Sequence, residues 1–182
     1  MRFAVAPIAG AWLIDLDPVV DERGFFARTF CVDEFSERGI DANVAQCNMS
    51  LTRAAGTIRG LHYQVAPAAE TKLVRVVRGA VHDVIVDVRP DSETYLRHVA
   101  VELSEDNRRS LFVPVGCAHG FQTVVNETCV EYQMGAKYTP GTDRGVRFDD
   151  PQLAIAWPRP ITEVSARDRG WPLIADRTDL IA

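Results

Sequence analysis

The stretch that decides the fold runs from Lys72 to Val88 and reads KLVRVVRGAVHDVIVDV. It contains two runs rich in β-branched residues, Lys72–Arg78 and Val81–Val88, which Gly79 separates. β-Branched residues favour strands, and a glycine between two such runs is a turn signal. Charged residues such as Arg75 interrupt both runs, which is typical of strands that turn one face toward a core or a cavity. The stretch therefore predicts two successive strands of a β protein.

The rest of the chain has the same texture, with short apolar runs between Gly, Pro, Asp and Asn. It predicts further strands at Trp12–Leu16, Phe25–Phe30, His98–Leu103, Leu111–Val115, Phe121–Val125 and from Val130–Tyr132 toward Tyr138. Two short helices are predicted at Val32–Arg38 and Ser165–Gly170, with Asp33 or Ser165 as caps. Many short strands and few helices indicate a β-sandwich or barrel. We expect a single domain over residues 1–182.

Composition narrows the class of partner. The chain has 182 residues, is 47% hydrophobic and 25% charged, and carries a net charge of −5. Because no long Lys/Arg run offsets this acidity, a nucleic-acid partner is disfavoured. No apolar run is long enough to cross a bilayer, and Pro7 interrupts the N-terminal apolar segment too early for a secretory signal. The four cysteines form no CxxC pair, so we expect reduced thiols in a cytoplasmic protein that does not bind membranes.

Two segments concentrate the residues that can do chemistry. GTIRGLHYQ contains His62, and PVGCAHGF contains His119. The spacings Gly-x5-His and Pro-x-Gly-x2-His resemble the two half-motifs of cupin jelly-roll barrels. Metal cupins carry a second His and then a Glu in the first half-motif, but here Gln64 and Lys72 stand near those places. Divalent metals need three or four neutral-nitrogen, thiolate or carboxylate ligands, so we expect no metal, and a metal-dependent dioxygenase is disfavoured.

These residues suit a cavity rich in positive charge and hydrogen-bond donors. Guanidinium groups hold phosphates through paired N–H bonds, a role open to three arginines: Arg23, Arg59 and Arg167. A neutral His oriented by a carboxylate can remove a proton next to a carbonyl, while Lys72 or a tyrosine stabilises the enolate oxygen. Asp168 is the candidate orienting acid, and Tyr132 is the candidate proton donor. The sequence thus predicts a site that binds an anion and moves protons.

A longer series of motifs extends from about residue 12 to residue 172. In chain order it comprises Asp21-Glu22-Arg23-Gly24-Phe25-Phe26, Gln46-x-Asn48-x-Ser50, Arg59-Gly60-Leu61-His62-Tyr63-Gln64, Lys72-Leu73-Val74-Arg75, Asp83 to Arg89, Pro114-x-Gly116-x-Ala118-His119-Gly120-Phe121, Tyr132, Tyr138, Asp143-Arg144-Gly145, Asp149-Asp150-Pro151 and Ser165-x-Arg167-Asp168. In order and spacing these motifs resemble the dTDP-4-dehydrorhamnose 3,5-epimerase family. The resemblance implies an all-β cupin jelly roll with a few short helices. It also implies a homodimer that acts on a nucleotide-diphosphate sugar without metal or organic cofactor.

The same resemblance implies a role for each site residue. His62 would be the base, oriented by Asp168; Tyr132 would return a proton from the other face, and Lys72 would stabilise the enolate. The diphosphate would contact three cationic residues: Arg23, Arg59 and His119. Two aromatic side chains would pack on the nucleobase or the sugar: Phe26 and Tyr138. Four further side chains would form a polar wall: Gln46, Asn48, Asp143 and Arg167.

One position departs from the family pattern. Two residues after Phe26, where described members have a carboxylate in the base pocket, this chain has Arg28. A carboxylate accepts from the ring N–H of thymine, whereas a guanidinium can only donate. Arg28 would suit an acceptor such as the ring nitrogen of cytosine, or it would turn outward. The nucleobase therefore stays open.

Three functions remain in competition. The first is inversion of both C3 and C5 of dTDP-4-dehydro-6-deoxy-D-glucose, which gives dTDP-4-dehydro-L-rhamnose. A near alternative keeps the chemistry but inverts one carbon or uses a CDP-linked deoxy sugar. A non-catalytic cupin that binds a nucleotide sugar is the alternative from another class. It would need no base and acid such as His62 and Tyr132.

Overall fold

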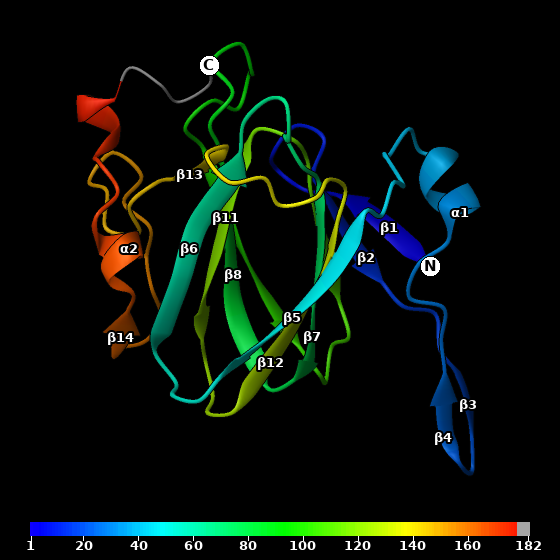
Figure 1. Ribbon diagram of the computed structural model, residues 1–182. Coiled ribbons are helices and arrows are strands. Elements are labelled where there is room, and N and C mark those ends of the chain that lie inside the picture. The colour runs from blue at the N-terminus through cyan, green and yellow to red at the C-terminus, as the bar shows by residue number, and fades with distance from the viewer. Residues whose placement is uncertain (178–182) are drawn as a thin grey trace.

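The computed structural model describes residues 1–177 and shows two mainly antiparallel β-sheets that face each other (Figure 1). The first sheet has the strand order β1 (Arg2–Val5), β2 (Trp12–Asp15), β10 (Ser110–Val113), β7 (Lys72–Arg78), β12 (Thr128–Met134) and β5 (Gln46–Thr52). The second has the order β13 (Asp143–Gly145), β6 (Thr57–Gln64), β11 (Cys117–Thr123), β8 (Ala80–Asp87) and β9 (His98–Ser104), with β14 (Glu163–Val164) paired to β6. The predicted all-β jelly-roll class is confirmed, as two facing sheets rather than one closed barrel.

Short elements lie outside the two sheets. Strands β3 (Val19–Asp21) and β4 (Gly24–Phe26) form a hairpin that projects away from them (Figure 1). The helices are α1 (Val32–Ser36), α2 (Ala166–Arg169) and the 3-10 turn η1 (Ile174–Asp176). None of these described helices is long and apolar enough to cross a membrane.

Both predicted helices are present but shorter than expected, and one of the two proposed caps is correct. The Ser165 hydroxyl accepts from the Asp168 backbone N–H at 3.0 Å and so caps α2. Asp33 does not cap α1, because Cys31 holds the N-cap position and Asp33 already lies in the first turn. There its carboxylate still meets the positive end of the helix dipole.

Two predicted strands end four residues earlier than expected. The run Phe25–Phe30 is strand only to Phe26; beyond it the chain turns so that Phe30 packs on Phe35 of α1, with ring centroids 4.9 Å apart. The run toward Tyr138 ends at Met134; the Gly135 N–H makes one more bond in register, to the Thr71 carbonyl, and residues 135–138 are not strand. Strands β1, β3, β5, β6, β13 and β14 were not predicted as strands.

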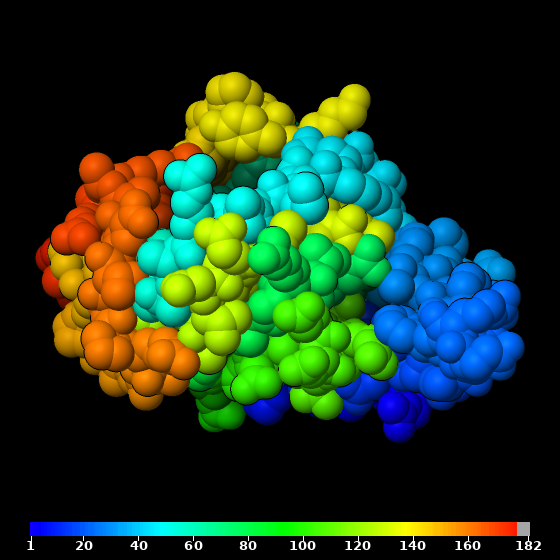
Figure 2. Space-filling model, turned by 90° about the horizontal axis from the view of Figure 1, so that it is seen from below, coloured from blue at the N-terminus to red at the C-terminus, as the bar shows by residue number. Residues whose placement is uncertain are grey.

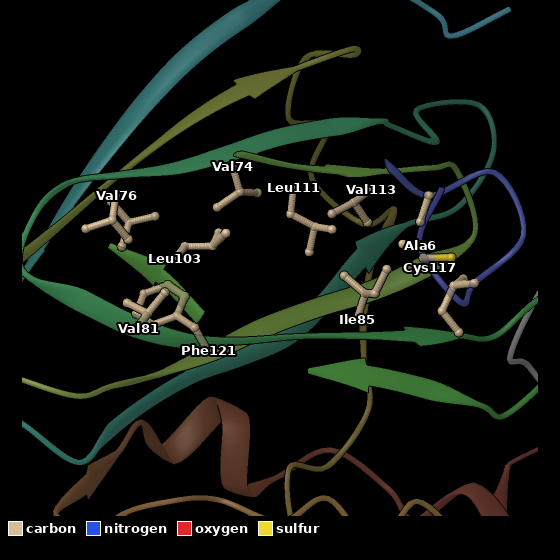
Figure 3. Packing of buried hydrophobic residues seen from close by; sticks show 13 residues of the cluster. Ala6, Val74, Val76, Val81, Ile85, Leu103, Leu111, Val113, Cys117 and Phe121 are labelled. Atoms are coloured by element: carbon tan, nitrogen blue, oxygen red, sulfur yellow. The ribbon is translucent and has the colours of Figure 1, made fainter. Parts of the chain in front are cut away.

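The main core lies between the two sheets, and each sheet contributes to it (Figure 3). Val74 and Leu111 come from the first sheet, while Ile85, Leu103 and Phe121 come from the second, all fully or almost fully buried. Apolar side chains thus fill one part of the space between the sheets. Polar side chains line the remainder, which stays open.

Strands β6 and β11 approach unusually closely beside this open part. A Cβ built on Gly60 would lie 2.4 Å from the Gly120 Cα, and one on Gly120 would lie 2.7 Å from the Arg59 carbonyl oxygen. Gly60 also has a φ of +130°, which other residues rarely adopt. The ladder is irregular between His119 and Phe121 at this point. Glycine at both positions allows His62 and His119 to stand opposite each other in the register.

Candidate active site

A cavity of about 920 Å³ opens between the two sheets. It is lined by eight of the residues that the sequence nominated: Asn48, Arg59, His62, Lys72, His119, Tyr132, Arg167 and Asp168. They come from β5, β6, β7, β11, β12 and the α2 segment, so residues from widely separated parts of the chain meet in one place. Its volume matches the range of small-molecule sites.

One wall of the cavity carries an imidazole fixed by a carboxylate. The Nε2 N–H of His62 on β6 donates to Asp168 Oδ1 at 2.6 Å. Asp168 is 5% exposed at its side chain, whereas His62 is 38% exposed and faces the cavity. Burial opposes ionisation of Asp168, but hydrogen bonds from His62, the Gly60 amide and Ser165 outweigh it and lower the pKa of the carboxyl group. The pair is therefore held as a carboxylate beside an imidazole ring.

The opposite wall carries a phenol. Tyr132 lies on β12 of the first sheet, with its hydroxyl 3.0 Å from the Ser50 hydroxyl on β5. Burial raises the pKa of the Tyr132 phenol, and the Ser50 hydrogen bond offsets this only in part. The Tyr132 hydroxyl is thus neutral at physiological pH and can donate a proton. His62 and Tyr132 stand on different sheets and line the same cavity.

Two further side chains, those of Lys72 and His119, line this space. Lys72 at the start of β7 is buried, and its Nζ donates to the His62 carbonyl oxygen at 2.8 Å. Burial lowers the pKa of Lys72, while the negative charges of Glu70 and Asp83 act against that decrease. His119 on β11 is buried and its Nε2 lies 2.9 Å from Asp83 Oδ1.

Three predicted residues form a rim beside the cavity instead of its lining. The Gln46 side chain accepts from the Tyr138 backbone N–H at 3.0 Å, and the Tyr138 hydroxyl donates to Asp143 at 3.3 Å. Asp143 also accepts from Arg167, which does line the cavity. Hydrogen bonds therefore join the rim to the lining.

The structure does not bring the three N-terminal candidates to the cavity of their own chain. Arg23 and Phe26 are on the projecting hairpin, with exposed fractions of 84% at the Arg23 side chain and 77% at Phe26. In Figure 2 this hairpin (blue) lies on the side of the molecule opposite the segment that precedes and includes α2 (orange). Arg28 instead donates to Glu34 of α1 at 3.0 Å. The role of these three residues in substrate binding therefore stays a prediction.

Sequence reasoning missed several partners of the site. Ser50 and Glu70 were not assigned to Tyr132 and Lys72, although Ser50 belongs to a quoted motif. The Asp83 carboxylate on β8 is hydrogen-bonded to His119 on β11, so this pair cross-links two strands. No local pattern could reveal the pairs of Ser50 with Tyr132 and of Asp83 with His119, since each joins different strands, whereas Glu70 is only two residues before Lys72.

The positions of Gln64 and Trp171 were also not foreseen from the sequence. Gln64 points away from the cavity, and its amide bonds to Glu70 and to the loop at residues 137–142. Trp171 lies after α2 with its ring centroid 6.5 Å from that of His62. The fold and cavity together define a jelly-roll enzyme with acid–base groups on facing walls.

Comparisons with known proteins agree with this class. The chain matches the family model described as dTDP-4-dehydrorhamnose 3,5-epimerase over residues 5–176. It is 42% identical over 177 residues to the dTDP-4-dehydrorhamnose 3,5-epimerase of Sinorhizobium fredii, covering 97% of this chain and 91% of that one. It is 37% identical over 180 residues to the dTDP-4-dehydrorhamnose 3-epimerase of Streptomyces niveus, covering 98% and 86%. A crystal structure of the Bacillus anthracis 3,5-epimerase with TDP and PPi bound has a TM-score of 0.90 and 41% identity, covering 95% and 99%.

The chain therefore belongs to the dTDP-4-dehydrorhamnose 3,5-epimerase family. It is an isomerase, and the family resemblance seen in its motifs is confirmed.

Proposed function

We propose that the protein inverts both C3 and C5 of dTDP-4-dehydro-6-deoxy-D-glucose and so forms dTDP-4-dehydro-L-rhamnose. One observation carries the proposal: an imidazole–carboxylate pair and a neutral phenol line the same cavity from opposite sheets. The 4-keto group acidifies the hydrogens on both neighbouring carbons. Inversion needs proton removal on one face and proton delivery on the other.

His62 is the base in this proposal. With Nε2 donating to the Asp168 carboxylate, Nδ1 carries the lone pair that accepts the proton from C3 or C5. The electron pair of the broken C–H bond forms a double bond to C4 of the sugar, and the C4 carbonyl oxygen becomes the enolate oxygen. Asp168 then stabilises the imidazolium that forms, as an orienting carboxylate does in other acid–base enzymes.

Lys72 and Tyr132 complete the step. The Lys72 ammonium donates to the enolate oxygen, where negative charge develops. Tyr132 protonates the carbon from the opposite face, and the enolate collapses to the ketone. Each inversion leaves one proton on His62 and takes one from Tyr132, so exchange with water resets both groups.

The nucleotide end of the substrate meets cationic groups in the same cavity. Arg59 is exposed there; its Nε donates to the Thr52 hydroxyl at 2.8 Å and its Nη2 to the Leu51 carbonyl oxygen at 3.4 Å, which leaves the remaining N–H groups of its fork for a phosphate. His119 and Arg167 add donors on the same lining. The TDP bound to the Bacillus anthracis relative supports a thymidine diphosphate ligand. Asn48, Gln46, Tyr138 and Asp143 form the polar wall and rim in this proposal.

We propose further that the active form is a homodimer in which the hairpin of one chain completes the cavity of the other. The hairpin exposes four large apolar side chains: Val19, Val20, Phe25 and Phe26. Strand β5, at the end of its sheet, exposes Met49 and Leu51. A second copy would cover both surfaces and would bring Arg23 and Phe26 to a substrate. The four cysteines are free thiols, which supports a cytoplasmic location.

Inversion of C3 alone is the second candidate, because the Streptomyces niveus relative is a 3-epimerase with similarity over nearly the whole chain. A trapping experiment separates the two. The protein is incubated with dTDP-4-dehydro-6-deoxy-D-glucose, the ketone is reduced with borohydride, and NMR assigns C3 and C5. We expect products of L configuration inverted at both carbons. Inversion at C3 alone would support the second candidate, and faster turnover of the CDP-linked sugar would contradict the nucleobase assignment.

A further inference from the structure

Lys72 has an environment that is unusual for a lysine. Its side chain is 8% exposed, and its Nζ makes two contacts among the described residues: the His62 carbonyl oxygen at 2.8 Å and Glu70 Oε1 at 3.3 Å. A buried ammonium without a carboxylate partner tends to lose its proton. An ammonium has three donors, so these two contacts leave one for a ligand in the cavity.

Glu70 is buried as deeply as its partner, with 4% of its side chain exposed. Its second oxygen, Oε2, accepts from the Gln64 amide. The same amide group donates to the Lys137 carbonyl and accepts from Thr139 and Thr142. Glu70 therefore links the ammonium in the cavity to the loop that carries the rim residue Tyr138.

Other ionisable groups around Lys72 cannot replace Glu70. Asp83 on β8 acts on Lys72 through its charge, but its carboxylate is bonded to His119 of β11. His62 of β6 meets Lys72 through a backbone carbonyl, and the neutral Tyr132 of β12 lines the same cavity. The neighbouring strands β10 and β12 place apolar Val113 and Met134 beside Lys72 in the ladders.

We infer that Glu70 is a positioning residue that keeps the Lys72 ammonium charged and directed into the cavity. This inference deepens the proposed function and rests on it for the role of Lys72 in turnover. Glu70 itself does not touch the substrate. Its effect passes through Lys72 by charge and through Gln64 by hydrogen bonding to the rim loop.

The lysine content of the chain makes a direct test possible. The sequence has two lysines, Lys72 and the exposed Lys137. Protein labelled with 13C at lysine Cε gives two resonances, and Lys137→Arg assigns them. The titration midpoint of Lys72 is then measured in the wild type, in Glu70→Gln, and in the control Glu131→Gln. The control removes the Glu131 carboxylate of β12, which pairs with Arg75 on β7, the strand of Lys72, and makes no hydrogen bond or ion pair with Lys72 itself in the described part of the chain.

We expect Glu70→Gln to move the Lys72 midpoint to lower pH by about one pH unit or more, the size typical of losing an adjacent opposite charge. Glu131→Gln should leave it in place. An unchanged Lys72 midpoint in Glu70→Gln overturns the inference. Because Gln keeps the shape and can pair with the Gln64 amide, we expect a folded variant. If that variant does not fold, Glu70→Asp is used, because it keeps the charge at a longer distance from Lys72. It should move the Lys72 midpoint in the same direction by a smaller amount, and an unchanged midpoint would again contradict the inference.

Turnover supplies the second readout. In Glu70→Gln we expect kcat to fall with little change in KM, and the basic limb of the kcat–pH profile to move down with the Lys72 midpoint. If the basic limb of the kcat–pH profile stays in place while the Lys72 titration midpoint moves, the positioning role is contradicted. The NMR titration needs no substrate, so an inactive wild type would defeat the proposed function while the titration still decides whether Glu70 holds Lys72.

Discussion

Asp168 lies 106 residues after His62 in the chain, yet its carboxylate is the hydrogen-bond partner of the imidazole. Three other groups hold it in place: the Ser165 cap, the Gly60 amide and the short helix α2. The hydrogen bond between His62 and Asp168 therefore depends both on strand β6 and on the C-terminal segment that contains α2. At the scale of residues, a carboxylate holds the proposed base, and the proposed acid lies on the opposite wall of the cavity.

Replacing Asp168 by Asn tests this arrangement. We expect kcat to fall roughly 10²- to 10⁴-fold, as when an orienting carboxylate is replaced in a catalytic triad, with a small change in KM. The reason is that an amide cannot stabilise the imidazolium and can favour the wrong tautomer. Steady-state rates give the comparison, with Asp149→Asn as the control, because the exposed Asp149 carboxylate pairs with Arg147 away from the cavity lining. Undiminished turnover by Asp168→Asn would show that His62 needs no carboxylate.

The same variant has a pH-dependent effect on stability. The folded pKa of Asp168 is lower than the reference value of 3.8, so the carboxylate stabilises the fold above pH 3.8. This contribution is lost as the pH falls below 3.8 and through the folded pKa. Urea unfolding should show the wild type more stable than Asp168→Asn near neutral pH, with the difference disappearing in acid. A difference that persists at the acid end would contradict the charge-based explanation.

At the scale of elements, strand β13 supports the base from the outside. Gly145 stands opposite His62 in the β13–β6 register, and a Cβ on it would lie 2.2 Å from the Trp171 ring. Trp171 in turn packs near His62 and beneath the Arg167 guanidinium, 5.4 Å from its ring centroid. The absence of a side chain at Gly145 thus lets the segment after α2 close against β6.

Gly145→Ala should therefore displace Trp171 and, with it, the α2 segment. We expect a loss of about 1–3 kcal/mol in the free energy of unfolding, typical of an overpacked site, and a lower kcat. Chemical denaturation and steady-state rates measure both. In the Trp171→Ala background the same substitution should cost little, because the clashing ring is absent. Equal costs in both backgrounds would place the strain elsewhere.

Elements also show what the sequence could and could not predict. The central strands β7 and β8 are rich in β-branched residues and were predicted nearly to their ends. Strand β5 was missed, although its sequence QCNMSLT alternates polar and apolar residues. Its polar residues Asn48 and Ser50 line the cavity, and its apolar residues Met49 and Leu51 are exposed and also border the cavity, so β5 has no apolar face packed on the core. Strands that line a polar cavity lose the apolar face that sequence reasoning looks for.

At the scale of the whole molecule, the exposed position of the β3–β4 hairpin has no explanation within a single chain. The motif Asp21–Phe26 pointed correctly to a family, but the sequence could not tell that its side chains lie far from the cavity of their own chain. Only an arrangement of two chains would satisfy both the motif and the exposed position. A local sequence pattern does not indicate whether a side chain contacts the cavity of its own chain or that of a second copy.

Mixing two inactive variants tests this arrangement. His62→Ala lacks the base, and Arg23→Glu repels the diphosphate from the hairpin side. In a heterodimer with exchanged hairpins, one of the two cavities has both His62 and Arg23 intact. Random pairing after co-refolding should restore about one quarter of the wild-type activity, since half of the dimers contain one intact site. No recovery, or a monomeric mass in solution, would contradict the dimeric site.

The central claim is that His62 and Tyr132 exchange protons with C3 and C5 from opposite walls of one cavity. The most direct measurement is proton NMR of dTDP-4-dehydro-6-deoxy-D-glucose incubated in D2O with the wild type, His62→Ala and Tyr132→Phe. We predict deuterium at both C3 and C5 with the wild type and none with His62→Ala. With Tyr132→Phe we predict that inversion is lost to a greater extent than deuterium exchange. Deuterium incorporation by His62→Ala at the wild-type rate would contradict the account.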